Sequence, residues 1–219
     1  REIHAPAGIA HFLEHMAFNG TKHYPDKQLL EFLAKGGVRF GYNVNAYTSR
    51  FETVYNLSDI PLARESFVDS VMLILHDWSC NISCEQEALD AERGVISEEW
   101  RRRDEVRARM AMAQTNLIYR GAKHTERNVL GTLEIINGFK REEILDFYEK
   151  WYRPDLMSVV IVGDIEPEEA VKGIRNVRTQ MNVPPSRKAT VYVVSSEKEV
   201  RDTFEGSKVF FATLGGASE

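Results

Sequence analysis

Three residues near the start of the chain have types and spacing that could do chemistry together: His11, Glu14 and His15, within the segment HFLEH. On a helix, residues i and i+4 project from one face, so the two imidazoles would lie about one turn apart. That separation suits two nitrogen ligands of a tetrahedral Zn²⁺ ion. Glu14 would lie on the same flank, within reach of a water at such an ion. The alternative is a pair of surface or capping histidines on an amphipathic helix.

A hydrolytic zinc site needs a third protein ligand from another element, together with one open position for water. A long predicted helix that begins near Ser83 or Cys84 offers several acids. They are Glu85, Glu87, Glu92, Glu98 and Glu99. Glu85 and Glu92 share a face with apolar residues, where a carboxylate is costly unless it meets a cation. Glu98 and Glu99 precede three arginines and are expected to form a solvent-exposed charged face with i,i+4 pairs.

Composition excludes several other classes of protein. The chain has 28 Lys and Arg against 33 Asp and Glu, a net charge of −5, so it lacks the basic surplus of a nucleic-acid-binding protein. Its longest apolar run, 157–162, is too short to span a membrane. Two cysteines, Cys80 and Cys84, cannot form a disulfide framework. The first residues, REIHAP, do not read as a signal peptide, and the absence of an initiator Met suggests a processed or excised piece.

The elements that would position these residues are a mixture of helices and strands. Helices are predicted over 7–18 and 25–37, after Pro61 with an apolar stripe from Phe67 to Trp78, from residue 83 or 84 to beyond Arg109, and over 129–136, 141–151 and 167–177. Strands are predicted within 38–58 and over 157–162, 189–194 and 208–213. Because helices and strands mix without strict alternation, the sequence predicts an α+β fold.

Several motifs in fixed order resemble the insulinase/pitrilysin family of zinc peptidases. They are GIAHFLEHMAFNGTKHYP, NAYTSRFETVY, LDAERGVISEEWRRR and FYEKWYRPDLMSVVIVGDI, and the similarity runs from Gly8 to about Ile174. The family signature is H-x-x-E-H, the inverzincin motif, followed by 76 residues and a Glu. In this chain 76 residues separate His15 from Glu92. The wording of the motifs is most similar to that of bacterial insulinase-like peptidases.

The resemblance implies a role for each matching residue. His11, His15 and Glu92 would bind Zn²⁺, and Glu14 would be the general base that activates a water for attack on a peptide bond. Glu85 would support the metal ligands without binding the metal itself. The segment Asn45, Ala46, Tyr47 and Thr48 corresponds to an exposed edge strand, along which an extended peptide substrate adds as a further strand.

The resemblance also implies a domain organisation. Residues 1–180 would form an insulinase-type metal-binding catalytic domain without its first two strands, and residues 181–219 would form C-terminal strands or a linker. Active members use a second homologous domain, and nothing after Gly163 is expected to resemble one. The expected function is a zinc metalloendopeptidase domain acting on unfolded peptides. The alternative is a non-catalytic core or binding domain of the same fold, inert without its partner domain. Bacterial relatives favour the periplasm or cell envelope.

Overall fold

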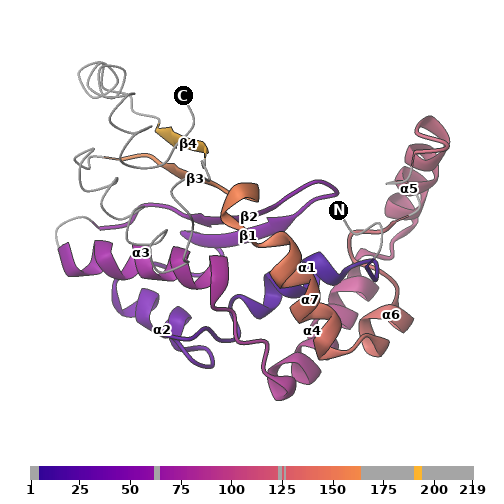
Figure 1. Cartoon of the computed structure of the whole chain (residues 1–219). Helices are drawn as coiled ribbons and strands as arrows, with labels where there is room; N and C mark the ends of the chain where they lie inside the picture. The colour runs from indigo at the N-terminus through magenta and orange to yellow at the C-terminus, as the bar shows by residue number, and fades with distance from the viewer. Residues whose placement is uncertain (1–4, 62–64, 123–124, 126, 164–189, 194–219) are drawn as a thin grey trace. The chain divides into compact units, whose positions relative to one another are not determined.

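The computed structural model describes residues 5–61, 65–122, 125, 127–163 and 190–193, and the fold is shown in Figure 1. The chain divides into two compact units. Unit 1 comprises Arg1–Asp59 and Ile82–Tyr148, and unit 2 comprises Ile60–Asn81 and Glu149–Glu219. All the residues that the sequence singles out for chemistry belong to unit 1, so its elements are the ones that position the site.

Helix α1, Ile9–Met16, carries the two histidines. Its apolar residues recur at helical spacing and are fully buried: Ile9, Phe12, Leu13 and Met16. The helix begins after Gly8, whose φ of 91° lies in the left-handed region. A Cβ at this position would lie 2.6 Å from the carbonyl oxygen of Leu130. Glycine is therefore required here both by the backbone angle and by the close approach of a second segment.

The segment predicted to be strand-like forms a hairpin. Strands β1, Val44–Thr48, and β2, Thr53–Leu57, pair antiparallel, with Val44 opposite Leu57 and Thr48 opposite Thr53. The Ser49 amide donates to the Glu52 carbonyl oxygen at 2.8 Å and closes the turn. Helix α1 packs against both strands on one side and against helix α4 on the other, which sets the hairpin and α4 on opposite sides of the histidine-bearing helix.

The long helix predicted to reach beyond Arg109 is two helices, α4, Gln86–Arg103, and α5, Val106–Ile118, so the prediction of one helix was wrong. The backbone leaves the helical region at Asp104 and is extended at Glu105. The physical reason is that the charged run around the break has no apolar residue to pack. Beyond it, no residue of α5 is buried, so tertiary packing does not hold the two helices in one line.

Contacts just before its first residue and near its middle hold α4 in place within unit 1. At its start, the Arg141 guanidinium donates to the carbonyl oxygen of Cys84 at 2.6 Å. Farther along, Arg93 donates to the carbonyl oxygens of Ile136 and, at 2.7 Å, of Phe139. Two short helices supply these partners, α6, Leu133–Gly138, and α7, Arg141–Trp151. The acids of α4 are therefore presented from a helix anchored to its neighbours by charge-assisted hydrogen bonds.

The remaining elements complete an α+β fold, which confirms the predicted class. They are α2, Gln28–Lys35; α3, Glu65–Cys80; the 3₁₀ turn η2, Pro154–Leu156; and the parallel pair β3, Ser158–Ile161, and β4, Thr190–Val193. The helix predicted over 167–177, the strand over 208–213 and the domain boundary near residue 180 lie outside the described residues. Within the part of the chain that the structure describes, no helix is both long and apolar enough to cross a membrane.

Candidate metal centre

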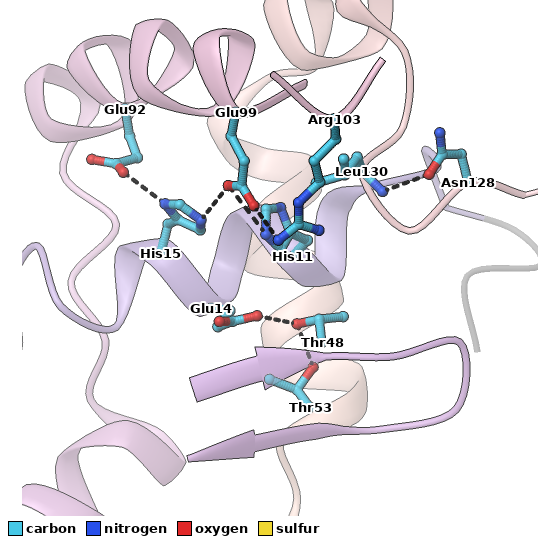
Figure 2. Close-up of polar contacts among 10 residues, drawn as sticks. All are labelled: His11, Glu14, His15, Thr48, Thr53, Glu92, Glu99, Arg103, Asn128 and Leu130. Carbon is cyan, nitrogen blue, oxygen red and sulfur yellow. Dashed lines mark hydrogen bonds and ion pairs between the residues drawn. The ribbon is translucent and has the colours of Figure 1, made fainter. Parts of the chain in front are cut away.

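His11 and His15 lie one turn apart on α1 and face α4, as the i, i+4 spacing predicts (Figure 2). Their ring centroids are 4.7 Å apart and the rings meet edge to face. The His11 ring is buried, with a side-chain exposure of 7%. Its Nδ1 atom is also buried and has no hydrogen-bond partner among the described residues.

The acid that meets both rings is Glu99 of α4. Its Oε2 atom lies 3.6 Å from Nε2 of His11 and 3.4 Å from Nε2 of His15. One ligand atom from each of these three residues lies within 4.8 Å of the other two, which makes the trio a candidate metal site. The expectation that Glu99 forms part of a solvent-exposed face was wrong, since its side chain is only 17% exposed.

The rest of that charged face matches the expectation. Glu98 is 63% exposed and pairs with Arg101 in solvent. The predicted i,i+4 pair also forms, because Arg103 contacts Oε1 of Glu99 at 2.6 Å. Glu99 therefore places one oxygen on an arginine and the other on the two histidines.

Glu92, the expected third ligand, contacts His15 from the other side of the ring. Its Oε1 atom lies 2.8 Å from Nδ1 of His15, and its Oε2 atom accepts a hydrogen bond from Nδ2 of Asn19 at 2.8 Å. Glu92 and Glu99 are two helical turns apart on one face of α4, whereas the histidines are one turn apart on α1. A single acid can therefore lie between both Nε2 atoms, and the structure places Glu99 there instead of Glu92.

Glu85, expected to support the site, lies away from it. It is the residue just before α4, at the N-cap, and it is exposed. The seven-residue spacing that related Glu85 to Glu92 in the sequence also relates Glu92 to Glu99. Glu85 precedes the first residue of α4, Gln86. The two acids that contact the histidines are therefore Glu92 and Glu99. Glu92, which contacts Nδ1 of His15, is the acid of α4 that lies beside a histidine without facing both rings.

Glu14 points toward the hairpin, from a face of α1 that adjoins the one carrying the two histidines. Its Oε2 atom accepts a hydrogen bond from the Thr48 hydroxyl at 2.5 Å, and Thr48 lies 3.2 Å from the Thr53 hydroxyl (Figure 2). Since the one hydroxyl hydrogen of Thr48 goes to Glu14, Thr53 must be the donor in the second bond. Burial raises the pKa of Glu14, and the hydrogen bond from Thr48 opposes that rise.

The two imidazoles have opposite pKa shifts because their partners differ. Burial and the neighbouring His15 lower the pKa of His11 to about 4. Burial alone would lower the pKa of His15 as well, but its hydrogen bonds to Glu92 and Glu99 outweigh burial and raise it to about 9. The bond to His15 in turn lowers the pKa of Glu99 to about 2. The pair of carboxylates thus holds one positive charge on His15, in a place that a metal cation would also fit.

The predicted substrate strand is β1. Asn45 and Tyr47 are exposed, and they alternate with Ala46 and Thr48, which are less exposed. The Asn45 side-chain oxygen accepts a hydrogen bond from the Ala46 amide at 2.9 Å. Among the described residues, β1 pairs with β2 along one edge, apart from an isolated bridge between Phe40 and Val44. Thr48, expected only to bind substrate, is also the partner of Glu14.

Comparisons with known proteins identify the family of the chain. Residues 2–132 match the model of the family described as Insulinase (Peptidase family M16). This chain belongs to the insulinase family of peptidases. It is 38% identical over 184 residues to the probable zinc protease PqqL of Haemophilus influenzae, which covers 84% of this chain and 20% of that protein. It is 34% identical over 194 residues to the Escherichia coli protein of the same name, covering 89% of this chain and 21% of that protein.

Solved structures of insulinase-family proteins share its fold. The first half of the periplasmic protease PqqL from Escherichia coli superimposes with a TM-score of 0.74 at 38% identity, covering 78% of this chain and 36% of that one. Residues 138–212 also match a model described as the Peptidase M16 inactive domain. That match corrects the expectation that nothing after Gly163 resembles a further domain of the family. The chain spans about a fifth of the length of the two curated relatives.

Sequence reasoning missed two residues of this centre. Glu99 was visible as the acid seven positions after Glu92 on the same helical face, but the adjoining arginines argued for a solvated role. Asn19, four residues after His15, had no signal of its own. Its contact with Glu92 joins residues 73 positions apart, which no local pattern predicts.

Proposed function

We propose that this chain carries the zinc-binding active site of a metallopeptidase that hydrolyses peptide bonds in unfolded peptides. The observation that carries the proposal is the convergence of His11, His15 and Glu99, with the carboxylate of Glu14 on the adjoining face of the same helix. Two imidazoles and one carboxylate are the donor set of many catalytic zinc sites. The family match and the relatives described as zinc proteases support the same chemistry.

In this proposal His11, His15 and Glu99 hold Zn²⁺, and Glu92 takes the place behind His15. A Glu92 carboxylate on Nδ1 keeps the hydrogen of His15 on that nitrogen and leaves Nε2 as the electron-pair donor. When bound, Zn²⁺ would lower the pKa of a coordinated water and polarise a carbonyl group. The third ligand proposed here, Glu99, replaces the sequence-based choice of Glu92 because Glu99 is the acid that faces both Nε2 atoms.

Glu14 is the proposed general base. Its carboxylate is buried, and burial raises its pKa toward the range in which a group both accepts and returns a proton near neutral pH. The Thr48 hydroxyl holds one oxygen, Oε2, which leaves Oε1 as the atom for proton transfer. Glu14 would accept a proton from the attacking water and pass it to the departing amine.

The strand β1 is the proposed peptide-binding edge. An extended peptide would add along Asn45–Thr48 through backbone hydrogen bonds. These bonds depend on an extended main chain more than on the identity of the side chains. Thr48 then has two tasks, because its backbone lies on this edge while its hydroxyl contacts Glu14. Such an arrangement would bring a bound peptide to the base and would favour unfolded substrates over folded ones.

We propose that peptide hydrolysis by the complete protein also requires residues outside this site. Because the chain spans about a fifth of its curated relatives, we propose that a second homologous domain of the same protein completes the substrate site. A chain limited to these residues would then bind metal but turn over peptide slowly or not at all. The periplasmic description of the related PqqL supports a periplasmic location for the parent protein.

The variant Glu14→Gln tests this function in the full-length protein. The substitution keeps the size of the side chain and its bond to Thr48 but removes the base. Peptide hydrolysis should fall by about 10²- to 10⁴-fold, while the zinc content stays at that of the wild type. The matched control is Glu98→Gln, an exposed acid of α4, which should change neither quantity. Unchanged hydrolysis in Glu14→Gln would overturn the proposed mechanism.

A further inference from the structure

Asn19 links the end of α1 to the acid behind His15. It lies three residues past the last residue of α1, and its amide nitrogen Nδ2 donates two hydrogen bonds. One goes to the backbone carbonyl oxygen of His15 at 3.1 Å, and the other to Oε2 of Glu92 at 2.8 Å. Glu92 uses its other oxygen for Nδ1 of His15. The three residues therefore form a closed loop of contacts in which both oxygens of Glu92 are occupied.

We propose that Asn19 is a positioning residue for the metal site, which acts by holding Glu92 against Nδ1 of His15. The proposal rests on the proposed function, because it assigns to Asn19 an effect on the binding of the metal by His15. Asn19 contacts neither the metal-facing nitrogen of His15 nor Glu99 in the hydrogen bonds described. Its effect on the metal would pass through Glu92.

The orientation of the Asn19 amide follows from its two partners. A carboxylate and a backbone carbonyl oxygen only accept hydrogen bonds, so the group that faces both must be the donor –NH₂. The reversed amide would set its own oxygen against two acceptors. The direction of the bond to Glu92 is therefore determined by chemistry.

The need for such a partner comes from the flexibility of glutamate. A Glu side chain has three rotatable bonds, and its free oxygen would otherwise be available to other cations. Burial would raise the pKa of Glu92, but the hydrogen bonds from His15 and Asn19 and the positive charges of His15 and Lys27 together lower it. With Asn19 holding Oε2, rotation of the carboxylate toward solvent would break two bonds instead of one. Because Asn19 is neutral, it restrains Glu92 without cancelling the negative charge that His15 uses.

A double-mutant cycle on zinc affinity tests the proposal in the full-length protein. Asn19→Leu removes the donor and keeps a similar volume, and competition with a chelator of known affinity gives the zinc dissociation constant. Loss of a partner behind a metal ligand costs about 10- to 100-fold in affinity, which is the range expected for Glu92→Ala. Asn19→Leu, one contact farther away, should cost about 3- to 10-fold. In the Glu92→Ala background, Asn19→Leu should change the constant less than twofold.

Asn137 offers a matched control for a purely structural effect. Asn137 lies near the end of α6, and its Nδ2 atom donates to the carbonyl oxygen of Leu133, four residues earlier, at 2.7 Å. This bond is of the same kind as that from Asn19 to His15. Asn137→Leu removes a bond of this kind alone and should leave zinc affinity unchanged.

A second variant, Asn19→Asp, keeps the shape and sets a carboxylate against Glu92. It should weaken zinc binding more than Asn19→Leu at pH 7, since like charges would push Glu92 away from its place. The proposal is overturned if Asn19→Leu leaves zinc affinity unchanged, or if its effect is equally large with and without Glu92. A wild-type protein that binds no zinc would overturn the proposed function itself, and with it this role.

Discussion

His15 is the residue at which the electrostatics of the site meet, because a different carboxylate lies on each of its nitrogens. Glu92 contacts Nδ1 and Glu99 contacts Nε2. Two acids of the same type, two turns apart on one helix, thus have different environments and different proposed tasks. The one facing both histidines would bind the metal, and the other would orient a ligand.

Zinc binding should therefore displace a proton from His15. Since the pKa of His15 is raised to about 9 and that of His11 is lowered to about 4, His15 is charged and His11 neutral at pH 7. Each zinc ion should release about one proton there, and zinc affinity should rise with pH until about 9. Calorimetric titration in buffers of different ionisation enthalpy measures the number released. Release of no proton at pH 7 would contradict the account of His15.

The raised pKa of His15 also predicts how the stability of the metal-free protein depends on pH. The pKa of His15 in the folded chain lies above the ordinary value of 6.5, so its stabilising contribution is complete below about 6.5. It is lost as the pH rises through about 9. Glu92→Gln removes one of the partners that raise this pKa, so the loss of stability with rising pH, measured by urea unfolding of the metal-free protein, should be smaller in this variant.

For individual residues, the sequence predicted the site correctly where the geometry depends only on neighbouring positions along one helix. His11 and His15 share a helix face because they are four residues apart on a helix, and the structure places them so. The choice among the acids of α4 was not local, because it depends on where α4 begins and on the length of chain that connects it to α1. A count of intervening residues cannot distinguish Glu92 from Glu99 when both lie on one helical face.

Among the elements, α1 depends on a close approach at its first turn. Gly8 has a φ of 91°, and an added Cβ would meet the carbonyl oxygen of Leu130 at 2.6 Å. Because the clashing group is backbone, it cannot turn aside as a flexible side chain would. The approach brings the segment after α5 against the start of the histidine-bearing helix and fixes where that helix begins.

Gly8→Ala should accordingly lower the free energy of unfolding by about 2 kcal/mol or more, from the strained backbone and the clash together. Urea unfolding of the metal-free protein measures this change. The control is Gly94→Ala on α4, where an added Cβ has no neighbour within 4 Å. That substitution should stabilise by about 0.5–1 kcal/mol, since alanine favours a helix interior. Equal effects of the two substitutions would contradict the role assigned to Gly8.

The elements themselves were largely predictable from apolar periodicity. The predicted helix over 141–151 coincides with α7, and the strand-like region 38–58 contains both strands of the hairpin. The break between α4 and α5 was not predictable in this way, because charged residues are compatible with a helix and do not mark its end. It follows from the packing, since no residue of α5 is buried.

For the whole molecule, unit 1 supplies every residue of the candidate metal centre from segments far apart in the sequence. The histidines, the base, the hairpin and the acids of α4 all belong to it. The metal centre is thus a property of one compact unit, whereas peptide turnover is proposed to depend on the rest of the parent protein. The α+β class and the family followed from the sequence, since the motifs are continuous segments. The packing of α4 on α1 required the structure.

The most direct test is an anomalous diffraction experiment at the zinc absorption edge on crystals of the full-length protein grown with Zn²⁺. We expect a single strong peak in unit 1, bounded by Nε2 of His11, Nε2 of His15 and a carboxylate oxygen of Glu99. Glu92 should still contact Nδ1 of His15. A peak coordinated by Glu92 in place of Glu99, or the absence of a peak between the two rings, would contradict it.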